Sequence, residues 1–204
     1  MRGSIRVDTS QLERKLAALV TELENEARPV LLAAARGTLR RADPGEAPYQ
    51  RAQKALWADL HRIFYPVDRP TKADGRIAST YRSLRGSRPA RRIAVSRREL
   101  AAHLARISAR FGKANAGFNP GARISGFRPP GWVARHRPGQ GSATWRHTGA
   151  ALRLRIVNEV SYAARVGSIK GKLSAAAPMA RAEMMRSWRG RHLPAAIRKA
   201  GWSA

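Results

Sequence analysis

Acidic and histidine side chains, which most hydrolytic sites need, are few and far apart in this sequence. The chain of 204 residues contains 13 Asp or Glu and 5 His. Beyond the first helical segment the carboxylates are scattered along the chain: Asp43, Glu46, Asp59, Asp68, Asp74, Glu99, Glu159 and Glu183. A pair of converging carboxylates, as in a glycosidase, is therefore not indicated.

Motifs with the spacing of a metal site or a nucleophile are also missing from the sequence. There is no His-Glu-x-x-His, no Gly-x-x-x-x-Gly-Lys-Ser/Thr loop and no Gly-x-Ser-x-Gly elbow. His136, His147 and Glu159 are the residues on which a nuclease or a peptidoglycan-cleaving enzyme would depend, but no nearby acid completes a metal or base pair. We therefore predict no catalytic, metal-binding or cofactor-binding residues, and a protein that is not an enzyme.

Positive charge is the dominant feature of the composition. The formal net charge is +27, and between Arg76 and Asn158 the only acid is Glu99. Such a charge repels itself and favours a polyanion or an acidic partner surface. Nucleic acid and an acidic protein both remain open as partners. The alternative is that the many arginines reflect the codon usage of a GC-rich genome, in which case the charge has no function.

Composition also restricts the class of protein. The hydrophobic fraction of 43% argues against a fully disordered chain, and no apolar run of membrane-spanning length occurs. The first residues lack an apolar stretch, so no secretory signal is expected. Cysteine is absent, which excludes disulfides and thiolate metal sites and fits assembly in a reducing cell.

Apolar periodicity predicts mainly helices in the first half of the chain. Ser10 to Glu13 matches a capping box and begins a helix over about 10–27, after which Pro29 starts a new helix or a kink that runs to about Arg41. Further elements are expected as helices over 48–64 and 75–86, a short strand over 91–95, and a helix over 97–110 with a second capping box from Ser96 to Glu99.

Residues 111–147 have a different character, because Gly and Pro recur every few positions. Regular structure is not expected through that density, so we predict a long irregular loop or arm. One interpretation is an arm that reaches a neighbouring subunit through its aromatic residues, and another is contact with DNA. A loop folded over its own domain is the third alternative.

A strand is predicted by the alternation of Leu152, Leu154 and Ile156 with Arg153 and Arg155. The apolar side chains should face a core and the arginines should face outward. Asn158-Glu159 should end the strand, residues 168–172 form a basic turn, and residues 175–189 form a helix with Pro178 in its first turn. A last short helix is expected over 194–200.

The segment Ile156-Val-Asn-Glu-Val-Ser-Tyr-Ala-Ala-Arg-Val-Gly167 resembles a signature of phage minor tail protein Z and related tail-completion, or neck, proteins. The matching pattern is a strand, then Asn, then Tyr-Ala, then Val-x-Gly. The family often has an acidic residue before the Gly and Thr after it, whereas Arg165, Val166 and Ser168 stand in this region here. The resemblance covers residues 148–167 closely and the N-terminal helices loosely.

The resemblance implies a structural virion protein at the head–tail junction, assembled in the host cytoplasm. Its subunits would form a homo-oligomeric ring of six- or twelve-fold symmetry. The ring would join tail to connector, bind other neck, connector and tail proteins, and surround the DNA channel. It would have no membrane partner. The alternative from charge alone is a nucleic-acid-binding protein that acts through its basic surface.

The predicted fold class is α+β: N-terminal helices packed on a small antiparallel sheet, with a long irregular loop or arm and a C-terminal helix. The expected divisions are a mainly helical part over 1–110, the arm over 111–147, and the core strand with the C-terminal helix over 148–204. Basic and aromatic side chains from the last two divisions are the predicted contacts to DNA or to a partner protein. They are Arg123, Arg128, Trp132, Arg135, Arg137, Trp145, Arg153, Arg155, Lys170 and Lys172.

Overall fold

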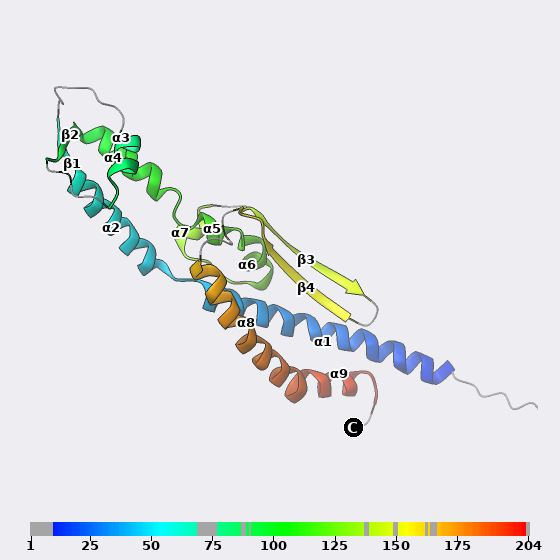
Figure 1. Ribbon diagram of the computed structural model, residues 1–204. Coiled ribbons are helices and arrows are strands. Elements are labelled where there is room, and N and C mark those ends of the chain that lie inside the picture. Colours follow the sequence, from blue (N-terminus) through cyan, green and yellow to red (C-terminus); the bar gives the residue numbers. More distant parts are fainter. Residues whose placement is uncertain are drawn as a thin grey trace, which may run out of the picture. The chain divides into compact units, whose positions relative to one another are not determined.

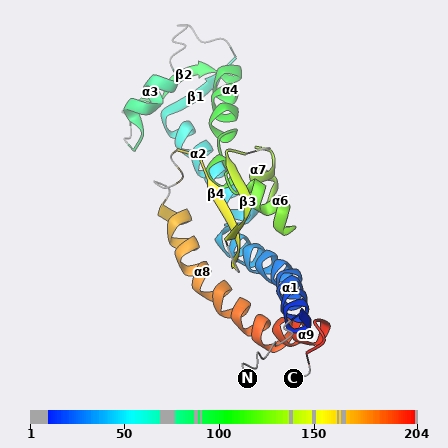
Figure 2. The ribbon, with the colours of Figure 1, turned by 90° about the vertical axis from the view of Figure 1, so that its right-hand side faces the viewer.

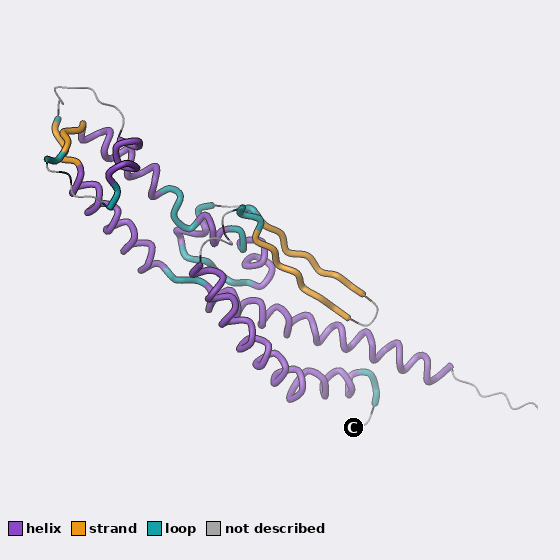
Figure 3. The backbone as a smooth tube through the Cα atoms, in the orientation of Figure 1, coloured by secondary structure: helices purple, strands orange, loops and turns teal. Residues whose placement is uncertain are grey.

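The computed structural model describes residues 10–68, 77–86, 89, 91–136, 139–148, 151–161, 163 and 167–202. The residues that the structure describes are 69% helical and include two small sheets and a C-terminal helix, which confirms the α+β class (Figure 3). It forms two compact units that differ from the predicted divisions. The first comprises Met1–Asp43, Ala114–Pro129 and Arg137–Ala204, and the second comprises Pro44–Lys113 and Pro130–His136.

The first unit is organised around one long helix, α1 (Ser10–Ala42). Of the two alternatives predicted at Pro29, the start of a new helix is wrong, because α1 continues through this residue. Proline removes one backbone hydrogen bond from a helix. Contacts on both sides compensate, since Glu26 before the proline binds His192 and Arg41 after it pairs with Glu183. Tertiary packing therefore overrides the local preference.

An antiparallel hairpin of β3 (Gly141–Thr148) and β4 (Ala151–Asn158) lies along α1 (Figure 1). The strand predicted from Leu152 to Ile156 is confirmed, and it ends at Asn158 as expected. Its burial alternates, with Arg153 and Arg155 exposed and Leu152 and Leu154 half-buried. A short helix, α6 (Asn119–Ser125), packs against β3.

Three consecutive helical segments complete the first unit and run along α1 (Figure 2). They are α8 (Gly167–Ser187), a π-helical turn η2 (Trp188–His192) and α9 (Leu193–Lys199). The basic turn predicted over 168–172 is therefore helical, and Pro178 lies inside α8 rather than in its first turn. Buried alanines at positions 176, 180 and 196 allow the helices to approach each other closely.

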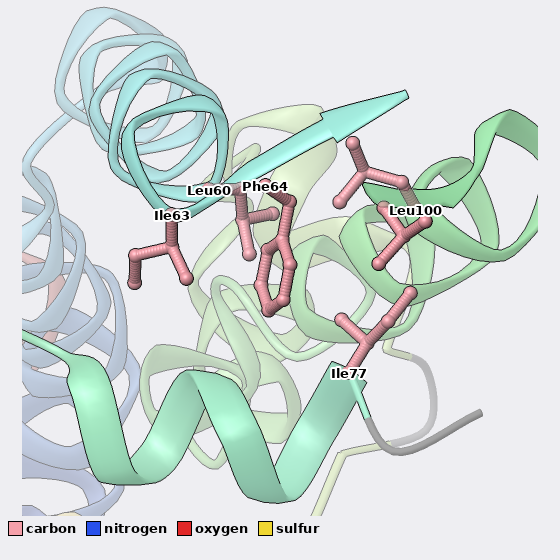
Figure 4. Packing of buried hydrophobic residues seen from close by; sticks show 6 residues of the cluster. Leu60, Ile63, Phe64, Ile77 and Leu100 are labelled. Atoms are coloured by element: carbon pink, nitrogen blue, oxygen red, sulfur yellow. The ribbon is translucent and has the colours of Figure 1, made fainter. Parts of the chain in front are cut away.

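The second unit has a small core of its own. It contains α2 (Glu46–Ile63), β1 (Phe64–Val67), α3 (Ile77–Leu84), β2 (Ile93–Ser96), α4 (Arg97–Ser108) and α7 (Gly131–Ala134). Buried side chains from the two strands and three of the helices form one apolar cluster (Figure 4): Leu60, Ile63, Phe64, Ile77, Val95 and Leu100. This cluster fixes α3 and α4 beside α2.

The helices α2, α3 and α4 and the strand β2 were predicted, whereas β1 was not, and two local expectations differ from the structure. β1 and β2 form a parallel pair, whereas we expected one antiparallel sheet. The strands have four residues each, too few for a clear alternation. The capping box at Ser96 is wrong, because Ser96 precedes α4 but its side chain makes no capping hydrogen bond.

The prediction of an irregular arm over 111–147 is wrong for the described residues of that segment. They form α5 (Lys113–Ala116), α6, α7 and β3. Glycine ends short helices here instead of preventing them: Gly126 adopts a φ of 70° at the end of α6, a conformation that favours glycine. The segment packs within its own chain, where Arg36 on α1 donates to the Ser125 carbonyl oxygen at 2.7 Å.

Candidate nucleic-acid interface

The outer surface of the hairpin carries three arginines, which we call the arginine face: Arg146, Arg153 and Arg155. Arg146 stands opposite Arg153 in the register, and Thr144 stands opposite Arg155. Residues that face each other across an antiparallel pair lie on the same side of the sheet. All three arginines are exposed, so the cationic groups gather on one side of the ribbon.

The inner surface of the hairpin is held by α1. The guanidinium of Arg28 lies 5.8 Å from the centre of the Trp145 ring, and His147 Nε2 lies 3.1 Å from Glu24 Oε1. Leu152 lines an apolar groove together with side chains of α1. These contacts fix which side of the ribbon faces outward.

The arginine face has no counter-ion within the described part of the chain. None of the three guanidinium groups forms an ion pair or hydrogen bond with a described residue, and Arg146 and Arg153 are direct cross-strand neighbours. Like charges directly opposite destabilise a sheet by roughly 0.2–1 kcal/mol. An external anion would relieve this repulsion. A two-stranded ribbon also fits the major groove of DNA, where arginine binds phosphates and guanine.

The structure brings only some of the predicted contact residues together. Arg153 and Arg155 share a face, joined by Arg146, which sequence reasoning did not select. The alternation in Thr144–Thr148 indicates a strand with Arg146 on one face, but the density of Gly and Pro around it favours the irregular arm. Four other predicted residues lie on separate elements: Arg123 and Arg128 are exposed in and after α6, and Lys170 and Lys172 lie in the first turns of α8. Arg137 lies outside the described residues.

Trp132, Arg135 and Trp145 make contacts within the chain, and their contact with DNA or a partner protein stays a prediction. The Trp132 ring stacks on Tyr49 with centroids 6.3 Å apart and lies 6.2 Å from Phe111. The Arg135 guanidinium lies 4.4 Å from the centre of the Trp132 ring and donates to the Phe111 carbonyl oxygen at 3.1 Å. These side chains hold α7 against the end of α4, while Trp145 lies beneath Arg28.

The three residues on which an enzyme would depend, His136, His147 and Glu159, make separate contacts. His136 Nε2 lies 2.8 Å from the Phe111 carbonyl oxygen, and His147 is paired with Glu24. Glu159 is exposed, and its backbone N–H donates to the Gln140 carbonyl oxygen. Within the described ranges, no group of three or more His, Asp or Glu side chains is arranged to hold a metal ion. None of the helices described is long and apolar enough to cross a membrane.

Comparison with known proteins gives no relative from which a role could be transferred. No family model, curated protein or solved structure matches the chain.

Proposed function

We propose that this protein is a structural subunit of a phage head–tail junction, a tail-completion or neck protein that assembles into a ring around the DNA channel. The resemblance of residues 148–167 suggests this role. The surface of α1 supports the assembly, and the arginine face supports the contact with DNA. The segment 111–147 no longer supports it, because its described residues fold onto their own chain.

The observation that carries the proposal is an uncovered apolar strip on α1. Leu12, Leu16 and Val20 follow one another at helical spacing and are 51%, 46% and 49% exposed. We call these three residues the apolar ridge. Val20 also lines a groove of about 320 Å³ with Leu23, Leu31, Leu152, Met185 and Trp188. A row of half-exposed apolar side chains that continues into a groove favours an interaction site.

A second copy of the chain is the occupant that fits the charges around the ridge. Residues 10–28 of α1 are close to neutral, because Glu13, Glu22, Glu24 and Glu26 offset Arg14, Lys15 and Arg28, whereas most of the remaining chain is strongly basic. An apolar and nearly neutral surface on one copy can therefore meet the basic surface of the next without charge repulsion. Contact between different surfaces of identical subunits is head-to-tail, and it closes into a ring when the rotation permits.

The assembly is tested by light scattering after gel filtration and by negative-stain imaging, with and without phage tails. We expect a ring of six- or twelve-fold symmetry that attaches to tail ends. The double variant Leu16→Asp/Val20→Asp should reduce the assembled fraction at least about tenfold, because it places charge in an apolar interface. Ala18→Asp adds one carboxylate at an exposed position of the same helix, away from the ridge, and should assemble normally.

A homogeneous 22.4 kDa monomer that does not bind tails would contradict the proposal. So would equal assembly by the ridge variant and the Ala18→Asp control.

The second candidate is a nucleic-acid-binding protein that acts through its basic surface, and the arginine face favours it. The two candidates differ in what the ridge variant does. If the protein functions by binding DNA as a single chain, Leu16→Asp/Val20→Asp should keep its full affinity for duplex DNA. Binding that falls steeply with salt indicates phosphate contacts, whereas binding that survives raised salt indicates a protein partner.

A further inference from the structure

The second unit contains a cleft that the proposed function does not use. The cleft lies between α2, α3 and α4 and has a volume of about 940 Å³, at the upper end of the range typical of small-molecule sites. Tyr81, His103 and Phe111 contribute aromatic surface to its lining. Four arginines also line it, and we name it the cationic cleft after them: Arg82, Arg85, Arg106 and Arg110.

The charge of the cationic cleft is not neutralised within the described chain. Asp59 is the only acid in its lining, and both carboxylate oxygens are already engaged. One accepts a 2.8 Å hydrogen bond from the Tyr81 hydroxyl, and the other forms an ion pair with Arg62. None of the four lining arginines has an ion-pair partner among the residues that the structure describes.

His103 provides an independent sign that the cationic cleft takes a polar ligand. This residue is only 4% exposed, and neither ring nitrogen has a hydrogen-bond partner within the described chain. Leaving a buried polar group unpaired costs roughly 1–3 kcal/mol. Burial, and then the charge of Arg106, lower the pKa of His103, so the ring is neutral near pH 7 and has one N–H to donate. A ligand oxygen in the cleft would accept that hydrogen bond.

We propose that the cationic cleft binds the phosphate group of a nucleotide, with the base over the aromatic part of the lining. Arginine forks match phosphate oxygens, and aromatic rings stack on bases. The Tyr81 and His103 rings meet edge to face with centroids 5.9 Å apart, which leaves mixed aromatic and polar surface for a planar group. The nucleotide is either free in solution or part of a single strand, since both present the same phosphate and base.

Calorimetric titration with three probes tests this site: inorganic phosphate, adenosine monophosphate and a single-stranded oligonucleotide of about ten nucleotides. The variant Arg82→Gln/Arg106→Gln should weaken nucleotide binding about tenfold or more, because two charge-assisted contacts are lost. Arg91→Gln/Arg98→Gln removes the same charge from exposed positions outside the cleft lining and should bind nearly as the wild type does.

A second variant separates the cleft from general charge. Ala55 is an exposed residue of the cleft lining, and Ala55→Trp fills the space without removing an arginine. It should abolish nucleotide binding, whereas Arg153→Gln/Arg155→Gln on the hairpin should leave it unchanged. Failure at this site is therefore distinguishable from failure of the arginine face. In the wild type, the ring nitrogen signals of His103 should shift when the nucleotide is added.

The three probes also identify the source of the phosphate. Binding of the monophosphate that both cleft variants abolish supports a free nucleotide, and binding of the oligonucleotide alone with the same sensitivity supports a strand. Absence of binding by the wild type would overturn the proposal. Equal losses in the cleft variant and in the Arg91→Gln/Arg98→Gln control would overturn it as well, since the charge alone would then explain the affinity.

Discussion

The side-chain amide of Asn158 donates a 2.8 Å hydrogen bond to the carbonyl oxygen of Ala114. The Oδ1 atom of the same side chain accepts a 3.1 Å hydrogen bond from the backbone N–H of Val160. Asn158 thus ties the end of β4 to the short helix α5, which lies far away in sequence. This asparagine belongs to the signature that resembles tail-completion proteins, and here its contacts are structural.

Gly117 makes this arrangement possible, and its substitution should destabilise the first unit. A Cβ atom at this position would lie 1.8 Å from Asn158 Oδ1, so the amide would have to move and lose its hydrogen bonds. We expect Gly117→Ala to lower the free energy of unfolding by about 1–3 kcal/mol, measured by chemical denaturation. The measurement should follow a signal of the first unit, for example Trp145 fluorescence.

Gly171→Ala is the matched control for this prediction. Gly171 lies inside α8, and a Cβ atom there would meet nothing within 4 Å. Alanine is favoured over glycine in a helix, so this variant should be as stable as the wild type or more stable by up to about 1 kcal/mol. Equal effects of the two substitutions would show that the close contact at Asn158 does not exist in solution.

Much of the fold follows from local pattern, because apolar spacing marks the helices and the alternating strand clearly. The predictions failed where long-range contacts decide the outcome. Pro29 suggested the start of a new helix, but α1 continues through this residue, where other helices pack along it. Gly and Pro density in 111–147 suggested an arm, although three short helices and a strand fit between the glycines. Sequence distance hides contacts such as that of Arg36 with Ser125.

The candidate site was predictable only in part, for a related reason. Alternation alone places Arg153 and Arg155 on the outer face of a strand, but Arg146 joins them only through the register of the hairpin. The cationic cleft was not predictable, because Arg82 and Arg106 come from two helices that the core around Leu60 and Ile77 brings together. The burial of His103 and the lack of hydrogen-bond partners for its ring nitrogens within the described chain are properties of the fold that no sequence pattern indicates.

The arginine face should bind duplex DNA through its phosphates. We expect Arg153→Gln/Arg155→Gln to weaken binding about tenfold at low salt and to lower the slope of log affinity against log salt by about 2, since two phosphate contacts are lost. Fluorescence anisotropy over a salt series measures both quantities. The same variant should be slightly more stable than the wild type, because the cross-strand repulsion between Arg146 and Arg153 disappears.

Arg189→Gln/Arg191→Gln is the control for charge alone, since both side chains are exposed in η2. It should change the affinity less than the hairpin variant does. If both variants weaken DNA binding equally, the arginine face is not a specific interface and the net charge is responsible.

Trp132 should stabilise the second unit rather than mediate assembly. Its ring contacts Tyr49, Phe111 and the Arg135 guanidinium. We expect Trp132→Ala to lower the free energy of unfolding by about 2 kcal/mol or more and to leave the oligomeric state unchanged while the protein is folded. Trp57→Ala, at a 41% exposed position of the same unit, should cost about 1 kcal/mol or less. If Trp132→Ala had normal stability but no longer assembled, Trp132 would instead be a contact to another subunit.

Glu26 should make the stability of the first unit depend on pH in the acid range. Hydrogen bonds from Lys199 and then His192 lower the pKa of Glu26 below its ordinary value of 4.5. The unfolded chain therefore binds the proton more readily than the folded chain does. The contribution of Glu26 to the free energy of unfolding is complete well above pH 4.5, and it is lost as the pH falls through the lower pKa of the folded state. Glu26→Gln should lower the melting temperature near neutral pH, and the difference from the wild type should shrink towards about pH 3.

Glu159→Gln separates this effect from a general loss of negative charge. Glu159 is exposed in the same unit, and its side chain has no partner among the described residues. Its substitution should leave the difference in melting temperature from the wild type small and nearly constant with pH, because no ion pair is broken. A difference for Glu26→Gln that stays constant down to about pH 3 would mean that the carboxylate of Glu26 is not what holds α9 on α1.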